Sequence, residues 1–277
     1  MNAPIVLPVF DPIAFSLGPL IIRWYALAYI TGLLGAWFFM KKLAAHAVEG
    51  HSPLLKTPDD LDDYVVWLAF GVILGGRLGY VLFYNPSYYF SHPDEILAVW
   101  RGGMAFHGGL LGVICATIIF CRRRHIPTFA LLDLAAITAP FGLMWGRIAN
   151  FINGELWGRV ADPAVVPWAM VFPMAGSEPR HPSQLYEAFF EGAVLFGIMM
   201  AVFLLCSKIR MRVGTLTGVG LIGYGVMRFF MEFFREPDPF LGLFWGQISM
   251  GQILSLPMVA GGAVVMVWSW RRVAQAS

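Results

Sequence analysis

Residues 146–159 carry an unusual density of groups able to bind an anion. They read GRIANFINGELWGR and follow a long apolar run. Arg147 and Asn150 are three residues apart, so a helix would place both on one face. Glycines at positions 154 and 158 permit tight turns and close backbone approach. A snorkelling arginine beside a polar helix end is the structural alternative, but such an end does not need arginine, two asparagines, a glutamate and three glycines within fourteen residues.

A polar stripe runs along a later apolar segment. Tyr224, Arg228 and Glu232 recur at intervals of four residues, and Arg235 follows three residues later. All four therefore face one side of a helix. Arg228 and Glu232 can form an ion pair, which lowers the cost of burying both charges. The stripe is either a structural pair that joins helices or an anion site. If Arg228 and Glu232 form a structural pair, Arg235 or Arg147 would contribute more to anion binding.

Two further segments supply candidates. Residues 102–112 read GGMAFHGGLLG, and their glycines predict close helix packing. Within them, His107 is either a base near neutral pH or a packed core residue. The segment RHPSQLYE opens a later helix, and Gln184, Glu187 and Glu191 share one face of it. A structural role and a catalytic role both stay open for this turn.

The remaining candidates are single residues in apolar surroundings. Tyr25 and Arg77 could be inward-facing polar groups of the first two apolar segments, whereas Asp133 is expected to be structural. The cysteines show no metal-like spacing and are expected to be small buried hydrophobic residues: Cys115, Cys121 and Cys206.

The elements that must position these groups are membrane helices. Of the 277 residues, 58% are hydrophobic and only 13% charged, whereas a soluble protein carries about 25% charged residues. A spanning helix needs about 20 mostly apolar residues, and the apolar runs are too long for barrel strands. We predict an all-α integral membrane protein, a single polytopic domain over residues 1–277. Its spans, about seven in number, are expected at residues 21–40, 64–84, 104–121, 129–148, 185–206, 216–234 and 252–270.

Basic residues predict the orientation of these spans, because they concentrate in cytoplasmic loops. Lysines and arginines follow the first, third, fifth and seventh spans, so the N-terminus is expected outside and the C-terminus in the cytoplasm. Residues 149–183, rich in proline and aromatic residues, would form a small extracytoplasmic cap. The N-terminus lacks a basic stretch before its first apolar run, so the first helix is expected to stay in the protein.

The other arginines fall within spans or on the predicted outer side. Charge inside a span is costly and marks a functional interior, so the chemistry is expected toward the outer leaflet. Several arginines in one membrane pocket indicate an anionic ligand, and bidentate guanidinium groups suit phosphate. A phosphate already embedded in a membrane belongs to a phospholipid head group.

In residue type and spacing, residues 146–158 resemble the signature of the prolipoprotein diacylglyceryl transferase family. One departure is Ala149, where a glycine is more common. The resemblance covers nearly the whole chain in family order, through residues 23–25, 76–80, 107–109, 181–187, 224–238 and 249–252.

The resemblance implies a multi-pass enzyme of the bacterial cytoplasmic (inner) membrane that performs the first step of lipoprotein maturation. It would move a diacylglyceryl group from phosphatidylglycerol to the lipobox cysteine thiol of a prolipoprotein signal peptide, forming a thioether and releasing glycerol 1-phosphate. These two substrates and membrane lipids are then the partners. No cofactor, metal or nucleic acid is expected.

Roles follow from that chemistry. The thiol must lose its proton before it attacks carbon, and His107 is the candidate base, with a glutamate or tyrosine in competition. Arg147 and Arg228 would stabilise the charge that develops on the departing phosphate. The other expected site residues orient the head group or hold the arginines. We expect Tyr25, Asn150 and Tyr224 to orient the head group, and Tyr224 is also a catalytic candidate. Glu155 and Glu232 are expected to hold the arginines in place. Gly158 and Arg235 are expected as further binding residues.

Three other functions stay open at this point. A lipid-anion transporter fits the intramembrane arginines, but the sequence shows no inverted repeat and the arginines gather on one side. A different phospholipid-using enzyme, such as a CDP-alcohol transferase, would require a cluster of aspartates for a metal, and none lies within the predicted spans. A lipid-binding receptor could share the arginine pocket without needing the whole set of family motifs.

Overall fold

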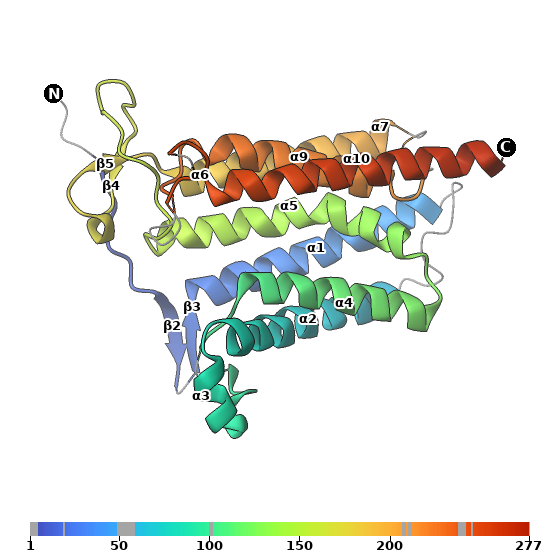
Figure 1. The fold of residues 1–277 in the computed structure, drawn as a ribbon, viewed down its shortest axis with the longest axis horizontal. Helices are drawn as coiled ribbons and strands as arrows, with labels where there is room; N and C mark the ends of the chain where they lie inside the picture. Colours follow the sequence, from blue (N-terminus) through green and yellow to red (C-terminus); the bar gives the residue numbers. More distant parts are fainter. Residues whose placement is uncertain are drawn as a thin grey trace. The chain divides into compact units, whose positions relative to one another are not determined.

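Long helices dominate the computed structural model (Figure 1). It describes residues 5–18, 20–48, 59–99, 102–206, 209, 212–237, 242–244 and 246–276. The long helices are α1 (Trp24–Val48), α2 (Asp59–Phe83), α4 (Phe106–Arg124), α5 (Thr128–Ile152), α9 (Thr215–Met231) and α10 (Met250–Ala276). A further continuous helix consists of α6 (Ser183–Glu187), a π-helical stretch (Ala188–Val194) and α7 (Leu195–Leu205).

Each predicted span overlaps one of these helices, and four of the helices are long and apolar enough to cross a membrane. These four are Asp59–Phe83, Thr128–Ile152, Ser183–Leu205 and Met250–Arg271, with Thr215–Met231 as a shorter apolar helix. The count of seven spans stays a prediction. The start of the first span was wrong, because residues 21–23 belong to a strand and the helix begins at Trp24.

Short strands depart from the all-α prediction. A three-stranded sheet joins β1 (Ile5–Val6), β4 (Met170–Val171) and β5 (Pro179–Arg180), with β1 parallel and β5 antiparallel to β4. A separate antiparallel hairpin consists of β2 (Ile13–Leu17) and β3 (Leu20–Arg23). Strands of two to five residues are too short to produce a reliable period-two pattern, so hydropathy could not reveal them.

The chain divides into two compact units, residues 1–39 with 133–277 and residues 40–132. In the second unit, glycines bring α2 and α4 into backbone contact, as the sequence predicted. A side chain at Gly79 would lie 2.7 Å from the Cα atom of Gly108, and one at Gly75 would lie 2.7 Å from that of Gly112. Small residues allow such close approach of membrane helices.

Arg77 organises the segment that connects α2 to α4. Its side chain is fully buried. Its Nε atom donates to the carbonyl oxygen of Ile96 (2.8 Å) and Nη2 to that of Glu95 (2.8 Å), while Nη1 donates to that of Gly102. Its guanidinium also lies over the ring of Tyr89, 5.0 Å from the centroid. Arg77 therefore serves as an inward polar group with a structural role.

In the first unit, a carboxylate of α5 caps the start of α9. Asp133 accepts hydrogen bonds from the backbone N–H groups of Gly214 and Thr217 (both 2.7 Å) and from the Thr217 hydroxyl (2.6 Å). Helix N-termini present unsatisfied N–H groups and favour negative charge. The structural role predicted for Asp133 is confirmed.

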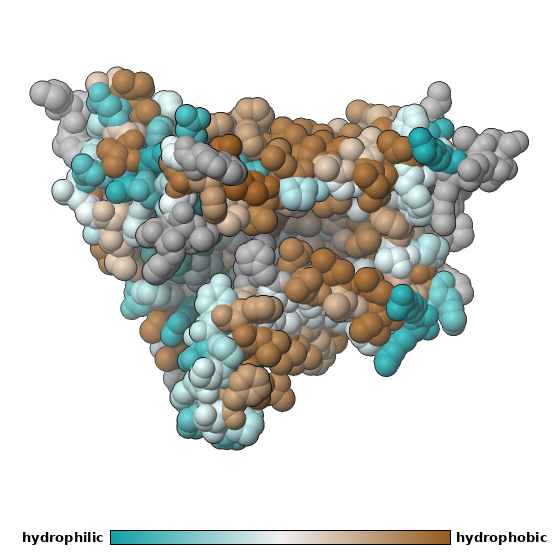
Figure 2. Space-filling model, in the orientation of Figure 1, coloured by the Kyte–Doolittle hydropathy of each residue, from teal (hydrophilic) through white to brown (hydrophobic). Residues whose placement is uncertain are grey.

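The surface of the first unit fits an apolar solvent. Over α9 and α10, hydrophobic residues predominate, while hydrophilic residues gather around β4 and β5 (Figure 2).

The prediction that all cysteines are buried was only partly right, since Cys121 is buried but Cys115 and Cys206 are exposed. Cys115 lies within α4, and Cys206 directly follows the end of α7.

Candidate functional site

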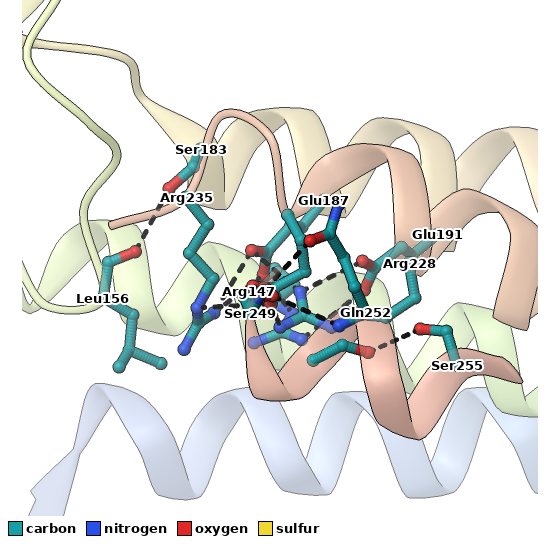
Figure 3. A network of polar contacts seen from close by, with 12 residues as sticks. Arg147, Leu156, Ser183, Glu187, Glu191, Arg228, Arg235, Ser249, Gln252 and Ser255 are labelled. Atoms are coloured by element: carbon teal, nitrogen blue, oxygen red, sulfur yellow. Dashed lines mark hydrogen bonds and ion pairs between the residues drawn. The ribbon is translucent and has the colours of Figure 1, made fainter. Parts of the chain in front are cut away.

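Three arginines and three glutamates meet in the first unit, and Figure 3 labels all of them except Glu232. They come from α5, from the helix that starts at Ser183, and from the end of α9 with the turn that follows it. We refer to them as the arginine–glutamate cluster: Arg147, Glu187, Glu191, Arg228, Glu232 and Arg235.

Glu187 lies at the centre of this cluster. Its carboxylate oxygens lie 2.8 Å from Nε of Arg147 and 3.1 Å from Nη1 of both Arg228 and Arg235. One buried carboxylate therefore fixes three guanidinium groups that are far apart in the sequence. Hydrogen bonds between charged groups are shorter and stronger than those between neutral groups, and a low-dielectric interior strengthens them further.

The arginines of the cluster are largely buried with their edges partly exposed, whereas its glutamates are buried almost completely. The glutamate side chains are 0–5% exposed, whereas the arginine side chains are 14–18% exposed. Each guanidinium carries five N–H donors in a fixed fork, so donors remain available on the side away from the glutamates. These partly exposed donors are chemically suited to a negatively charged ligand.

Glu191 is held less tightly than its neighbours. It lies in the π-helical stretch, one turn beyond Glu187, and is fully buried. Its oxygens are 3.4 Å from Nη2 of Arg147 and 3.3 Å from Nη1 of Arg228, longer than the usual 2.7–2.9 Å of a charge-assisted hydrogen bond. Single π-helical turns are rare and occur frequently at functional sites.

Glu232 connects the cluster to α10. It pairs with Arg228 one turn earlier, as predicted, and accepts a hydrogen bond from the Ser249 hydroxyl (2.7 Å). Ser249 and Gln252 form a capping box at the start of α10: the Ser249 N–H donates to Gln252 Oε1 (3.0 Å), and the Gln252 N–H donates to Ser249 Oγ (3.2 Å). A side chain at Gly251 would collide with the Glu232 carboxylate.

A second polar group lies one turn further along α5. The Tyr25 hydroxyl donates to Glu155, and the Asn150 amide donates to Tyr25. Glu155 Oε1 also accepts from Asn150 (3.3 Å) and from Asn153 (3.5 Å). Glu155 was expected to hold the arginines, and this was wrong: its hydrogen-bond partners among the described residues are a tyrosine and two asparagines.

The loop that carries Glu155 is held in an unusual backbone conformation. Gly154 and Leu156 have φ angles of +65° and +58°, and positive φ is uncommon for a leucine. The start of α6 secures this loop, because Gln184 donates to the carbonyl oxygen of Glu155 (2.8 Å) and Ser183 to that of Leu156 (3.2 Å). Backbone strain of this kind persists only where surrounding contacts enforce it.

Gly158 lies between two neighbouring chain segments. Its N–H donates to the carbonyl oxygen of His181 (3.0 Å), and the N–H of Arg159 donates to that of Phe234 (2.9 Å). A Cβ atom at Gly158 would collide with both of these carbonyl oxygens. Arg159 adds a hydrogen bond from Nε to the carbonyl oxygen of Arg235 (3.0 Å). This ladder fixes the backbone of Arg235, and only glycine fits at its centre.

An aromatic group adjoins the ladder. His181 Nδ1 lies 3.2 Å from the hydroxyl of Tyr186, which accepts a hydrogen bond from Trp168 Nε1 (2.6 Å). The ring of Phe234 packs against His181 and Tyr186 with centroid distances of 5.3 and 5.6 Å. Burial lowers the pKa of His181, so this imidazole is neutral at neutral pH.

The structure thus unites most of the predicted site residues. Arg147, Arg228, Glu232 and Arg235 share the arginine–glutamate cluster. Tyr224 lies one turn before Arg228 and within electrostatic range of Arg147 and Glu191. The backbone of His107 lies in the first turn of α4, but its side chain lies outside the described residues.

Glu187 and Glu191 were predicted to share one helix face, with a structural or a catalytic role, but they were not predicted to bind the arginines. The signal was present in the sequence, since two carboxylates four residues apart within an apolar helix share a face and require partners. The described residues contain no group of three or more His, Cys, Asp and Glu side chains that could hold a metal ion.

Comparison with known proteins places this geometry in a family. The family model described as prolipoprotein diacylglyceryl transferase matches residues 12–268. A phosphatidylglycerol–prolipoprotein diacylglyceryl transferase of Paramagnetospirillum magneticum is 52% identical over the whole of both chains. Proteins with the same name from Beijerinckia indica (54%, covering 96% of each chain) and Rhodopseudomonas palustris (50%, covering 97% of this chain and 93% of the relative) are similarly close. The chain therefore belongs to the prolipoprotein diacylglyceryl transferase family.

Proposed function

We propose that this chain transfers the diacylglyceryl group of phosphatidylglycerol to the lipobox cysteine thiol of a prolipoprotein, the first step of lipoprotein maturation. The thiolate sulfur attacks the carbon of the diacylglycerol part that is bonded to the phosphate oxygen. A carbon–sulfur bond forms there and the carbon–oxygen bond breaks. Glycerol 1-phosphate leaves with the bonding electron pair. The relatives reported above carry this activity in their names.

The partial exposure of the three guanidinium groups, beside buried glutamates, carries the proposal. The departing phosphate gains negative charge as its bond to carbon breaks, and prealigned donors stabilise that charge without reorganising. Arg147 and Arg228 are fixed by Glu187 and Glu191, which supplies that alignment. Arg235 extends the same face toward the ladder at Gly158.

The polar group around Tyr25 suits the glycerol part of the head group. Asn150 and Arg147 are three residues apart on α5, so a ligand bound to one lies close to the other. Asn150 and Tyr25 offer hydrogen-bonding groups for hydroxyls, and Glu155 fixes their orientation. His107 is the proposed base for the substrate thiol, with Tyr224 in competition for that role.

The membrane arrangement belongs to the same proposal. Seven helices cross the inner membrane, the N-terminus lies outside and the C-terminus in the cytoplasm. Residues 149–183 form a cap over the site at the outer leaflet. The hydrogen bonds that join residues 157–159 to residues 234–236 support placing these two segments on the same side of the membrane.

The decisive experiment uses purified protein, phosphatidylglycerol and a lipobox peptide. Release of glycerol phosphate and the mass of the peptide are measured together. We expect a diacylglyceryl mass gain that disappears with Arg147→Ala and with a peptide whose cysteine is replaced by serine. Binding of phosphatidylglycerol without turnover would refute the transferase function and favour a receptor or transporter.

A further inference from the structure

The arginine–glutamate cluster is balanced in charge before any ligand arrives. Its three arginines are paired with three glutamates. Arg159 is nearby, but its guanidinium donates to the carbonyl oxygens of Arg235 (3.0 Å) and Glu232 (3.4 Å). It thereby compensates the negative end of the α9 dipole. A lipid phosphodiester that binds here adds one negative charge to a neutral, buried site.

A buried site cannot accept that charge without a response. Taking an unpaired charge out of water is strongly unfavourable in a protein interior. An incoming phosphate that recruits Arg147 and Arg228 must therefore share them with the glutamates or replace one glutamate. A carboxylate that loses its arginines in a buried position becomes neutral by taking up a proton.

The contacts of the three glutamates single out one of them. Glu187 is paired with three arginines at 2.8–3.1 Å. Glu232 has the Ser249 hydroxyl in addition to Arg228. Glu191 has only its longer contacts to Arg147 and Arg228 among the described residues, at 3.3–3.4 Å, and it is fully buried. If these two arginines turn to a phosphate, Glu191 keeps no partner.

Building on the proposed function, we infer that Glu191 takes up one proton when phosphatidylglycerol binds, so that the phosphodiester replaces the charge of Glu191 beside Arg147 and Arg228. The groups that face Glu191 are these two arginines from α5 and α9, Tyr224 from α9, and Glu187 from its own helix. Arginines stay charged throughout the neutral range, and Glu187 keeps Arg235. Proton uptake therefore belongs to Glu191.

Calorimetry tests this directly on the full chain. A short-chain phosphatidylglycerol is titrated into the protein at neutral pH in two buffers of different ionisation enthalpy, and the difference in heat gives the number of protons bound. We expect one proton per lipid for the wild type and none for Glu191→Gln, which mimics the neutral carboxyl and binds at least as tightly. If one proton is taken up on binding, the Kd of the wild type for the lipid should rise tenfold for each unit by which the pH is raised across the neutral range.

Two controls separate Glu191 from other titrating groups. Glu236→Gln makes the same chemical change at the exposed partner of Arg180 (3.1 Å), and His181→Gln removes the nearby imidazole. Both variants should still take up one proton. Binding of the wild type without proton uptake, uptake retained in Glu191→Gln, or uptake lost in His181→Gln would each overturn the inference. The absence of any phosphatidylglycerol binding would instead refute the proposed function.

Discussion

At the scale of single residues, the site depends on arginines whose partners were only partly evident from the sequence. The spacing of Tyr224, Arg228, Glu232 and Arg235 predicted one polar stripe, and the Arg228–Glu232 pair lies within it. Local spacing could not reveal that Glu187 connects Arg147 to this stripe. That contact joins α5, α6 and α9, and periodicity reports only the face of one helix.

The geometry of Arg147 leads to a specific kinetic prediction. Arg147→Lys keeps the charge but replaces a planar fork, bonded through Nε to Glu187 and through Nη2 to Glu191, with a single ammonium. We expect kcat/KM to fall by about 10²–10³-fold, the usual loss when one prealigned donor is removed. Glycerol phosphate release measures this. Arg122→Lys, at an exposed position of α4, should keep wild-type activity, and equal losses in both variants would contradict the prediction.

At the scale of elements, helices were predictable and their connections were not. Apolar length located the helices, because burial and backbone hydrogen bonding leave few other options in lipid. The strands β1, β4 and β5 and the ladder at Gly158 depend on pairing between distant segments. The glycine pattern of residues 102–112 did predict a close helix contact, since only backbone approach explains so many small residues on one face.

The ladder predicts that Gly158 tolerates no side chain. Gly158→Ala forces the carbonyl oxygens of His181 and Phe234 apart, which displaces the backbone that carries Arg235. We expect transfer activity to fall at least tenfold while the helical content, followed by circular dichroism, is preserved. Gly197→Ala adds the same methyl group where no atom lies within 4 Å, and it should be silent. Wild-type activity in Gly158→Ala would argue against this role for the ladder.

The Asp133 cap predicts a loss of stability rather than of catalysis. Asp133→Ala leaves the N–H groups of Gly214 and Thr217 without their acceptor, at a cost of about 2 kcal/mol for a charged helix cap. The expected readout is a lower midpoint of thermal unfolding in detergent with kcat unchanged below that temperature. The matched variant Glu178→Ala, at an exposed position of the predicted extracytoplasmic segment 149–183, should unfold at the same temperature as the wild type.

At the scale of the whole molecule, the amino-acid composition predicted a lipid environment, and the distribution of basic residues predicted the orientation of the helices in the membrane. The low charged fraction required lipid around the helices, and four helices meet the length and hydropathy of a membrane span. The number of spans stays a prediction, because a helix such as α9, with only 17 residues, is shorter than a typical span.

Orientation can be measured by labelling single cysteines. In a variant without the three native cysteines, Ser177→Cys in the cap should react with a membrane-impermeant maleimide in intact spheroplasts. Arg123→Cys, at the basic end of α4, should react only after permeabilisation. Both positions are exposed, so access of the reagent reports the side of the membrane. The reverse pattern would invert the predicted topology.

The hydroxyl of Ser249 makes two hydrogen bonds: it accepts one from the N–H of Gln252 at the start of α10, and it donates one to Glu232. This sharing has a consequence for biosynthesis. Chains are made from the N-terminus, so the last helix is the final part to leave the ribosome, after every arginine and glutamate of the site has already been inserted. Until α10 forms its first turn, Glu232 has its contacts with Arg228 and Arg235 but lacks the hydrogen bond from Ser249. A nascent chain that stalls before residue 249 would therefore hold all the charges of the site without the contact that completes their arrangement.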